Sequence, residues 1–557
     1  MKNKRLGDML ISRGVISEDQ LNKALELQKT QGKRLGQTLV DNGFITEEQL
    51  IDTLREQLGV DYIDLNKTDI DPEMSQIIPR HVAEKDAIVP VKVVRDNLFL
   101  AMADPMNFFA LEEAQDISRK RVVPMIATRH GIEHAINVLY GNEGAAEAMA
   151  QMRAEAGFTG DEVKASDDQT ALEDAPTIRL VNSIIQRAWS EHSSDIHFEP
   201  TSGDMVIRMR IDGQLHRILT IPRDLQDSVT SRLKVMGRMN IVEKRIPQDG
   251  RAVLKLEGRD LDLRFSTLPT IFGEKIVIRL LGTDMELLDR RGIGIPESEN
   301  GKLDQLMKLT SGVIMIVGPT GSGKSSTMYA LIRELLSEQT NLITLEDPVE
   351  YQIDGATQVQ IDEKVGLTFA GGLRSVLRQD PDIICIGEIR DGETAEIAMR
   401  AAMTGHLVIT TIHTEDASAA IDRLKDMGVA PYLISAGLRG IISQRLLRRI
   451  CPRCRTAYTP DPATVRLAGI RSYEGRTYVH GAGCEYCFHS GYRGRTGVFE
   501  ILLMNDELRR CITSGGDRQE FRALAEKTDY VPMRVNADHL VEEGITTPEE
   551  IVRTMSV

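Results

Sequence analysis

A glycine-rich segment near the middle of the chain contains residue types that can bind phosphate. Residues 313–317 form a continuous apolar run typical of a buried parallel strand, and GPTGSGKS and a helix-like run follow it directly. In such a GxxxxGK[ST] loop the backbone N–H groups surround phosphate oxygens, the lysine reaches the β- and γ-phosphates, and the hydroxyl binds Mg²⁺. We therefore expect a nucleoside triphosphate and Mg²⁺ at Gly318, Pro319, Thr320, Gly321, Ser322, Gly323, Lys324, Ser325 and Ser326.

Three apolar, strand-like runs follow the phosphate loop, and each ends in residues that can take part in hydrolysis. Carboxylates at the ends of the first two runs can orient a water molecule or hold a metal ion, and an imidazole at the end of the third can sense the γ-phosphate. The residues at these ends are Glu346, Glu350, Glu388 and His413. This order of segments is the one expected of a RecA-like core.

Two of these positions leave alternatives open. Gly387 stands directly before Glu388, where other P-loop proteins often have Asp, so metal contact is left to Ser325, to water or to Glu388 itself. A lone histidine is usually structural, and His413 is a candidate because its strand ends beside the phosphate loop.

The region 176–285 is dense in arginine although the chain as a whole is acidic. Its arginines include Arg208, Arg210, Arg217, Arg232, Arg238, Arg245, Arg251, Arg264 and Arg279. Most are expected in surface ion pairs. If a few of these arginines bind a phosphate, that would explain why an arginine-dense domain precedes a nucleotide site.

Four of the six cysteines form two CxxC pairs, Cys451 with Cys454 and Cys484 with Cys487, and 29 residues separate the pairs. Each CxxC turn can place two thiolates on one tetrahedral ion, so the two turns complete a four-cysteine site. Disulfides are a weaker interpretation for a cytosolic chain. We expect a structural Zn²⁺, with the other two cysteines, Cys385 and Cys511, buried as small apolar residues.

The first 60 residues contain an internal repeat with an offset of 34 − 5 = 29 residues. Each unit predicts a short helix that ends at glycine, then a second helix that begins with a capping box, Ser17 with Gln20 and Thr46 with Gln49. An arginine beside a glycine, matched with a glutamine, suits guanine or phosphate recognition in a ligand with two equivalent halves. The alternative is that two helical hairpins simply pack together.

Composition excludes several classes of protein. The 557 residues are 41% hydrophobic and 27% charged, which is close to the soluble globular average and allows a sizeable core. The balance of 68 Lys+Arg against 83 Asp+Glu gives −15, which disfavours duplex nucleic acid as the main partner. No apolar run approaches the roughly 20 residues of a membrane span, and no secretory signal is evident, so we expect a cytoplasmic protein.

These segments predict an α/β protein with several domains. The regions are a tandem helical module at 1–60, a small α+β unit at 61–140 without visible chemistry, a linker at 141–175, the arginine-rich domain at 176–285, and a RecA-like ATPase domain at 286–557 with a zinc insertion at about 451–490. Within the arginine-rich domain, residues 232–241 are expected to be helical.

The motifs GPTGSGKS, ITLEDPVE, IGEIRD, GHLVITTIHT, SDIHFEP, RIDG and PQDGR resemble those of the type II/IV secretion ATPase family of GspE-, PilB- and MshE-like motors. The resemblance covers nearly the whole chain. It implies an aspartate box at Glu346 and Glu350, Walker B at Glu388 and a histidine box at His413. It also implies a PAS-like domain before the core and a homo-hexamer in which an arginine, here Arg210, reaches the nucleotide of a neighbouring subunit.

The N-terminal repeat resembles the tandem cyclic di-GMP-binding motif of MshE-type N-terminal domains, and both copies keep its length and five-residue spacer. The positions that the resemblance carries over are Arg5, Leu6, Gly7, Gly14, Gln28, Arg34, Leu35, Gly36, Gly43 and Gln57.

The resulting hypothesis is a hexameric ATPase that powers pilin assembly, docked peripherally on an inner-membrane platform protein and regulated by cyclic di-GMP. Type II secretion is the main alternative, because its motors share these motifs and the zinc site. A nucleic-acid remodelling ATPase is a more distant one, since RecA-like cores serve many functions. A further alternative is a cyclic dinucleotide receptor with a vestigial ATPase.

Overall fold

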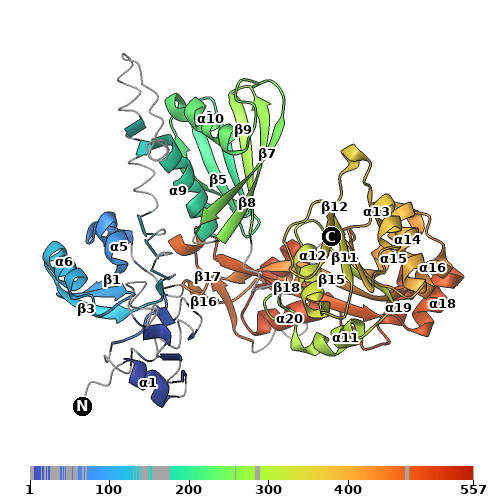
Figure 1. Cartoon of the computed structure of the whole chain (residues 1–557). Coiled ribbons are helices and arrows are strands. Elements are labelled where there is room, and N and C mark those ends of the chain that lie inside the picture. Colours follow the sequence, from blue (N-terminus) through green and yellow to red (C-terminus); the bar gives the residue numbers. More distant parts are fainter. Residues whose placement is uncertain are drawn as a thin grey trace. The chain divides into compact units, whose positions relative to one another are not determined.

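The chain divides into two compact units, residues 1–211, 215–259 and 263–280 in the first and residues 212–214, 260–262 and 281–557 in the second (Figure 1). The computed structural model describes residues 72–129, 176–256, 259–282, 289–470 and 476–555, with single residues and short runs between 6 and 70 and between 131 and 152. Within these described residues the strands form sheets of three, six, seven and two strands.

The first helix of the N-terminal repeat is present as α1 (Leu6–Ser12). The predicted capping box follows it, because the Ser17 N–H donates to Gln20 Oε1 at 2.9 Å and the Gln20 N–H donates to Ser17 Oγ at 3.2 Å. One small core joins both copies, and its buried members include two pairs at the repeat offset: Leu10, Ile16, Leu39 and Ile45. Equivalent residues of the two copies therefore share one core.

A three-stranded sheet lies in the part of the chain that showed no chemistry in its sequence. Its elements are η1 (Pro72–Gln76), α5 (Arg80–Asp86), β1 (Ile88–Val94), β2 (Asn97–Met102), α6 (Phe108–Ser118) and β3 (Arg121–Ile126). Strands β1 and β2 are antiparallel, while β3 returns parallel to β2 after α6. The predicted linker, residues 141–175, lies outside the described residues apart from four positions.

The arginine-rich domain is a six-stranded sheet in the order β6-β5-β4-β9-β8-β7. Its elements are α9 (Pro176–Ser190), β4 (Asp195–Pro200), β5 (Met205–Ile211), β6 (Gln214–Ile221), η2 (Arg223–Leu225), α10 (Gln226–Met236), β7 (Gln248–Leu256), β8 (Arg259–Thr270) and β9 (Gly273–Leu281). Alternation along β5 buries Met205, Ile207 and Met209 and leaves Arg208 and Arg210 together on the other face.

The expected helix over residues 232–241 is wrong in its second half. Helix α10 ends at Met236, and the Gly237 N–H bonds to the Leu233 carbonyl as its cap. A Cβ at Gly237 would lie 2.9 Å from the Met239 side chain and 3.1 Å from Phe265, so packing there requires glycine. The chain after it leaves the helix.

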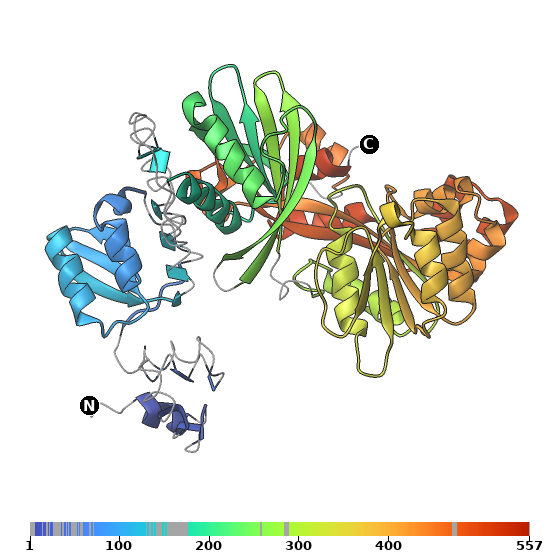
Figure 2. The ribbon, with the colours of Figure 1, turned by 45° about the horizontal axis from the view of Figure 1, so that its top comes forward.

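The second unit contains the RecA-like core, a seven-stranded sheet in the order β12-β11-β13-β14-β10-β15-β18 (Figure 2). Strands β10 to β15 in this sheet pair parallel, and β18 is antiparallel to β15. The strands are β10 (Gly312–Val317), β11 (Leu342–Glu346), β12 (Thr357–Gln360), β13 (Ile383–Ile386), β14 (Leu407–Ile412), β15 (Leu438–Ile450) and β18 (Tyr492–Leu503). The four segments predicted as strands, at the phosphate loop and after it, are β10, β11, β13 and β14.

Helices cover both faces of this sheet, as a strand buried on two sides requires. Apolar side chains of α11 (Glu297–Met307) and α12 (Lys324–Leu335) fill one face. The other is filled by α13 (Phe369–Val376), α14 (Gly392–Met403), α15 (Ala417–Asp426), α16 (Pro431–Gly437), α18 (Asp506–Ser514) and α19 (Arg518–Ala525). Strand β10 is buried throughout, and its alternate residues enter the two cores.

The remaining elements surround the cysteine pairs and the C-terminus. They are β16 (Arg455–Tyr458), α17 (Pro462–Ala468), β17 (Tyr478–Gly481), η5 (Glu485–Cys487), α20 (Met533–Glu542) and α21 (Pro548–Met555), while the short helix η4 (Glu363–Val365) lies between β12 and α13. Strands β16 and β17 pair as a separate antiparallel ribbon between the two cysteine pairs.

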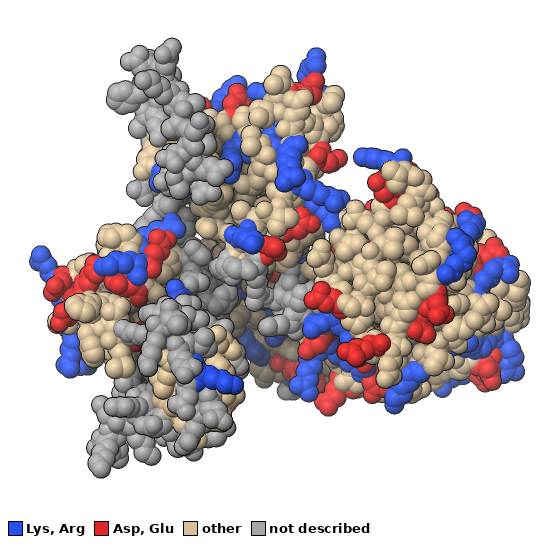
Figure 3. Space-filling view, viewed as in Figure 1, with Lys and Arg blue, Asp and Glu red and all other residues tan. Residues whose placement is uncertain are grey.

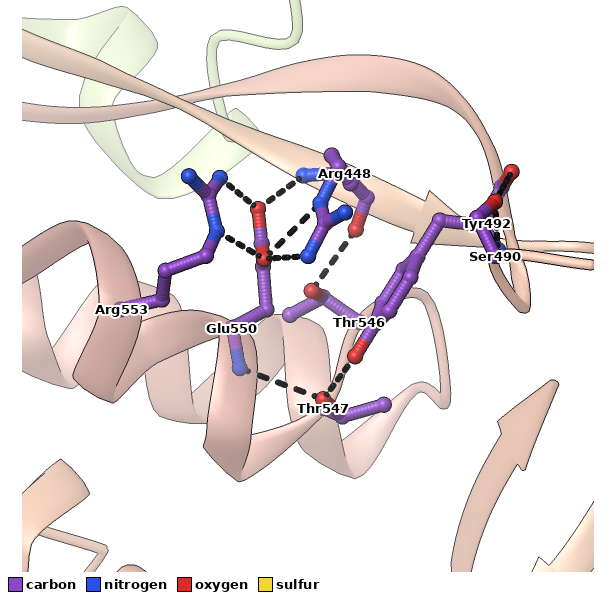
Figure 4. Close-up of polar contacts among 7 residues, drawn as sticks. All are labelled: Arg448, Ser490, Tyr492, Thr546, Thr547, Glu550 and Arg553. Carbon is purple, nitrogen blue, oxygen red and sulfur yellow. Dashed lines mark hydrogen bonds and ion pairs between the residues drawn. The ribbon is translucent and has the colours of Figure 1, made fainter. Parts of the chain in front are cut away.

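A buried ion pair fastens α21 to β15 (Figure 4). The carboxylate of Glu550, fully buried, accepts from Arg448 Nη2 at 2.7 Å and from Arg553 Nε at 2.7 Å. The guanidinium of Arg448 also lies over the Tyr492 ring, 4.2 Å from its centroid. Burial alone would raise the pKa of Glu550, but the hydrogen bonds from Arg553 and Arg448 outweigh it and lower that pKa.

We predict that Glu550→Ala lowers the free energy of unfolding by about 3–5 kcal/mol, because it leaves the buried Arg448 guanidinium without its counter-ion. Urea denaturation at pH 7 measures this, with Glu549→Ala on the same helix as the control, since the Glu549 carboxylate is exposed and its loss should cost less than about 1 kcal/mol.

The difference in the free energy of unfolding between the wild type and Glu550→Ala should also depend on pH. Because the folded-state pKa of Glu550 is depressed, its contribution is present above the unfolded-state pKa of about 4.3 and is lost as the pH falls through the folded-state value. Equal costs for the Glu549 and Glu550 variants at pH 7 would contradict the assignment.

Candidate functional site

The phosphate loop joins the end of β10 to the start of α12. A Cβ at Gly318 would lie 2.6 Å from the carbonyl oxygen of Gln444 on β15, so the loop passes too close to that strand for any side chain. Gly323 has φ of 87°, a left-handed conformation that lets the chain turn into the helix at Lys324. The first turn of α12 then carries Lys324, Ser325 and Ser326.

The ammonium group of Lys324 lies against its own loop. Its Nζ donates to the carbonyl oxygens of Gly318 at 2.9 Å and Pro319 at 3.1 Å. Burial lowers the pKa of Lys324 to about 8, and the nearby carboxylate of Glu388 opposes this effect. Phosphate oxygens in the loop would supply the negative charge that this ammonium group needs, and the open space around Gly321 leaves room for them.

His413 links this lysine to the Walker B carboxylate. Its Nδ1 lies 3.2 Å from Lys324 Nζ and its Nε2 lies 3.0 Å from Glu388 Oε2. A neutral imidazole with its proton on Nε2 satisfies both contacts. Glu388 also pairs with Arg390, whose Nη1 lies 3.2 Å from Asp347 Oδ2. The structure therefore brings Lys324, Glu388 and His413 into one cluster.

The two aspartate-box glutamates lie in different surroundings. Glu346 is 3% exposed, and its carboxylate accepts hydrogen bonds from Thr344 at 2.5 Å, from Gln358 at 3.1 Å and from Tyr329. In this structure three neighbouring side chains hold the Glu346 carboxylate, and its expected role toward a water molecule or a metal ion stays a prediction. Glu350 is exposed, and its backbone N–H donates to the Tyr329 hydroxyl at 3.1 Å.

Gly387 is packed against the neighbouring strand. A Cβ there would lie 3.2 Å from the Leu345 carbonyl oxygen and 3.4 Å from Glu346 Cα. An aspartate at this position would therefore be crowded by β11, which gives a physical reason for the departure from the usual Walker B pattern.

Sequence reasoning missed several residues that support the site. Gln444 donates from Nε2 to the Ser322 carbonyl at 2.7 Å, and Arg390 and Tyr329 hold the two carboxylates. Arg390 lies inside the motif IGEIRD, and Tyr329 follows Lys324 by five residues, so both stood next to recognised positions. Gln444 had no local signal.

The four cysteines of the CxxC pairs form a single cluster whose Sγ atoms all lie within 4.8 Å of one another. The Sγ separations are 3.8 Å for Cys451 and Cys484, 3.8 Å for Cys454 and Cys487, and 3.7 Å for Cys484 and Cys487. Tetrahedral thiolates about 2.3 Å from a zinc ion lie about 3.8 Å apart, whereas a disulfide bond is about 2.05 Å long. The cluster therefore fits a metal ion. Cys385 and Cys511 are buried elsewhere, as expected.

Arg210 lies on a charged face of the arginine-rich domain. Strand β4 places Asp195 between Arg210 on β5 and Arg279 on β9. Arg208 is held by two hydrogen bonds to Glu199, at 2.6 and 2.8 Å, whereas Arg210 Nε lies 3.7 Å from Asp195. Of these two arginines, Arg210 has the looser contact with an acidic partner.

Most of the predicted cyclic di-GMP positions lie outside the described residues. Those are Arg5, Gly14, Gln28, Arg34, Gly36, Gly43 and Gln57. Leu6 begins α1, and Leu35 is a partly buried member of the repeat core. At Gly7 a Cβ would lie 2.8 Å from the Leu21 side chain. The absence of a side chain at Gly7 therefore makes room for Leu21.

Comparison with known proteins gives matches over most of the chain. The family model described as "Type II/IV secretion system protein" matches residues 170–553. The type IV pilus assembly ATPase PilB of Myxococcus xanthus is 38% identical over 560 residues, covering 98% of both chains. The chain belongs to the type II/IV secretion ATPase family. It is thus an ATP-hydrolysing enzyme of the secretion and pilus motor group.

Other relatives of this family match smaller parts of the chain. Type II secretion system protein E of Dickeya dadantii is 46% identical over 395 residues, covering 71% of this chain and 78% of the relative. The structure of the Yersinia pseudotuberculosis ATPase DotB has a TM-score of 0.52 at 22% identity and covers 71% of this chain and 96% of its own, which supports the RecA-like fold alone.

A second family model, the MshEN domain, matches residues 58–146. This is the α+β unit and its flanks, not the repeat at 1–60 that carries the predicted ligand positions. Within the N-terminal region, the matched domain is therefore the unit whose sequence showed no chemistry.

We predict that the wild-type protein contains about one zinc ion per chain and that the Cys454→Ser/Cys487→Ser double variant contains almost none, because two ligands of four are lost. Plasma mass spectrometry measures the metal. Cys511→Ser is the matched control, since this buried cysteine lies outside the cluster. A metal-free wild type, or full zinc content in the double variant, would sink this assignment.

Proposed function

We propose that the chain is the motor ATPase that powers type IV pilus assembly. The observation that carries this proposal is the match to PilB over 98% of both chains, N-terminal region included. The matches to type II secretion protein E cover less of this chain, 71% for the Dickeya dadantii protein and 83% for the Pseudomonas aeruginosa protein. Type II secretion is the second candidate, because the identity over the part shared with the Dickeya dadantii protein is higher, at 46%.

The proposed site for hydrolysis is the cluster at the phosphate loop. ATP would be held by residues 318–326, with Ser325 contributing an oxygen to Mg²⁺ and Lys324 turning from its loop carbonyls to the β- and γ-phosphates. Glu388 is the candidate for orienting the attacking water, because its carboxylate is less buried than that of Glu346 and lies in the same cluster as Lys324.

His413 is proposed as the sensor of the γ-phosphate. Its imidazole bridges Lys324 and Glu388 when the ammonium group lies on the loop. When Lys324 turns to the phosphates, Nδ1 loses that donor and becomes available to the nucleotide side of the site. Binding of the triphosphate would thereby reach the Glu388 carboxylate through a single ring.

We further propose a homo-hexamer in which Arg210 acts on the nucleotide of the adjacent subunit. Several large apolar side chains of the arginine-rich domain are exposed, among them Val242 at 90%, Ile271 at 91% and Val253 at 66%. A second copy that covered these side chains would remove them from water. Arg208 is a weaker candidate, because two hydrogen bonds hold its guanidinium group to Glu199.

Cyclic di-GMP is the proposed regulatory ligand. Support comes from the MshEN match at residues 58–146 and from the Arg, Gly and Gln positions of the repeat, which remain predictions. The ligand would bind the N-terminal region and act on hydrolysis through the segment 141–175.

The proposed location is the cytoplasmic side of the inner membrane, with peripheral docking on a platform protein of the machine. Every helix in the described part of the chain is too short or too polar to cross a bilayer. A four-thiolate site also suits a reducing compartment.

Duplex nucleic acid is a disfavoured partner. Acidic and basic side chains are interspersed over the described residues on the visible face, which differs from the one-sign surface that backbone binding requires (Figure 3). DNA-stimulated hydrolysis with steep salt dependence would revive that alternative.

We predict that Lys324→Ala reduces ATP turnover at least about 100-fold while zinc content stays at the wild-type value, because the metal cluster is built from other elements. In a strain that lacks the chromosomal copy, the same variant should fail to restore surface pili. Counting pili by electron microscopy checks this. Loss of protein secretion with pilus number unchanged would contradict the pilus assignment and favour the type II alternative.

We predict that Arg34→Ala weakens cyclic di-GMP binding to the full chain about 10- to 100-fold, since one charged hydrogen-bond donor to guanine or phosphate is removed. Titration calorimetry measures the affinity. Arg13→Ala is the control, because Arg13 lies between the repeated positions and is exposed. Wild-type protein that releases no heat at saturating ligand would remove the regulatory claim.

A further inference from the structure

The side chain of Tyr329 is fully buried on α12, five residues after the phosphate-loop lysine. Its hydroxyl donates to the carboxylate of Glu346 and accepts from the backbone N–H groups of Glu350, at 3.1 Å, and Tyr351, at 3.2 Å. A tyrosine hydroxyl has one proton to donate and two lone pairs to accept with. Its hydrogen-bonding capacity is therefore filled by groups of the aspartate box.

The segment after β11 is held at several further points. The Gln358 side chain on β12 donates to Glu346 Oε1 at 3.1 Å and to the Tyr351 carbonyl at 2.8 Å, and accepts from the Ile353 N–H at 2.8 Å. The rings of Tyr329 and Tyr351 meet edge to face, with centroids 5.0 Å apart. Tyr329 and Gln358 thus grip residues 350–353 from the helix and from the edge strand.

This segment is connected to the candidate catalytic carboxylate. Asp347, between Glu346 and Glu350, accepts from Arg390 at 3.2 Å, and Arg390 pairs with Glu388. A shift of residues 347–351 would move the partner of Arg390 and with it the orientation of the Glu388 carboxylate. The Asp347–Arg390 pair is largely exposed, whereas the hydrogen bonds of Tyr329 and Gln358 to the buried Glu346 specify one arrangement of the segment when all of them are made.

We propose that Tyr329 is a positioning residue for ATP hydrolysis. Its hydroxyl ties the phosphate-loop helix to the aspartate box, so that Glu388 is correctly oriented when nucleotide occupies the loop. Burial and the Glu346 carboxylate both raise the pKa of Tyr329, so the hydroxyl keeps its proton and acts through geometry. The inference deepens the proposed hydrolysis site and does not depend on which machine the motor serves.

The test is Tyr329→Phe in the full chain, which removes the hydroxyl and keeps the buried ring. The kcat for ATP should fall about tenfold or more, because small misplacements of catalytic groups cost large factors in rate. The KM, and the affinity for a non-hydrolysable ATP analogue, should stay within about twofold, because the phosphate loop itself is unchanged. Steady-state ATPase assays and calorimetry measure these values.

Tyr530→Phe is the matched control. The Tyr530 hydroxyl also donates to a buried glutamate, Glu500 Oε2 at 2.8 Å, in the same unit but outside the phosphate-loop cluster. Its kcat should stay within about twofold of wild type. An equal fall in kcat for both variants would show a general loss of packing and overturn the proposal.

Further outcomes decide whether Tyr329 has this positioning role. Wild-type kcat in Tyr329→Phe, or an analogue affinity that falls as much as kcat, overturns the positioning role. If Tyr329→Phe fails to fold, Gln358→Met tests the same segment from β12 and should again lower kcat more than affinity; unchanged kcat there also overturns it. Wild-type protein without ATPase activity would instead contradict the hydrolysis site itself.

Discussion

The parallel register of the central strands is the constraint on which the nucleotide site depends. Val317 at the end of β10 pairs with Ile412 at the end of β14, and Leu345 on β11 pairs with Ile386 on β13. The residues that follow these ends are therefore brought to one edge of the sheet. Since both faces of the sheet are buried, a slip of one residue would exchange the two cores and is strongly disfavoured.

Strand β15 extends this constraint to the metal cluster. Its first half pairs with β10, Gln444 in its middle supports the phosphate loop, and its far end leads into Cys451. Near that end the buried Arg448 meets Glu550 on α21. One continuous strand thus connects the nucleotide loop, the C-terminal helix and the cysteine pairs.

The carboxylates of Glu346 and Glu388 lie in different environments. Glu346 lies buried among neutral donors, while Glu388 lies in a chain of charged groups with Lys324, His413 and Arg390. Environment separates the roles of nearby carboxylates in many enzymes. This difference in environment is the basis for proposing Glu388, rather than Glu346, as the residue that orients water.

The sequence by itself determined the elements with strong local signals. Glycines and a lysine at set spacing, apolar runs typical of buried strands, and paired cysteines predicted the loop, the core strands and a metal cluster, because each of these patterns is local in the sequence. The capping box at Ser17 and Gln20 belongs to the same class. The end of α10 was misjudged, because the close packing of Gly237 against Phe265 comes from distant strands.

Only the tertiary structure decided which groups meet. The contacts of Tyr329 with Glu346, of His413 with Lys324 and Glu388, and of Gln444 with the loop join residues from 17 to 122 positions apart. No local spacing encodes such contacts, because they follow from strand order and register. The chemistry of the individual residues was therefore legible in the sequence, whereas the difference between a buried and a reactive carboxylate required the folded core.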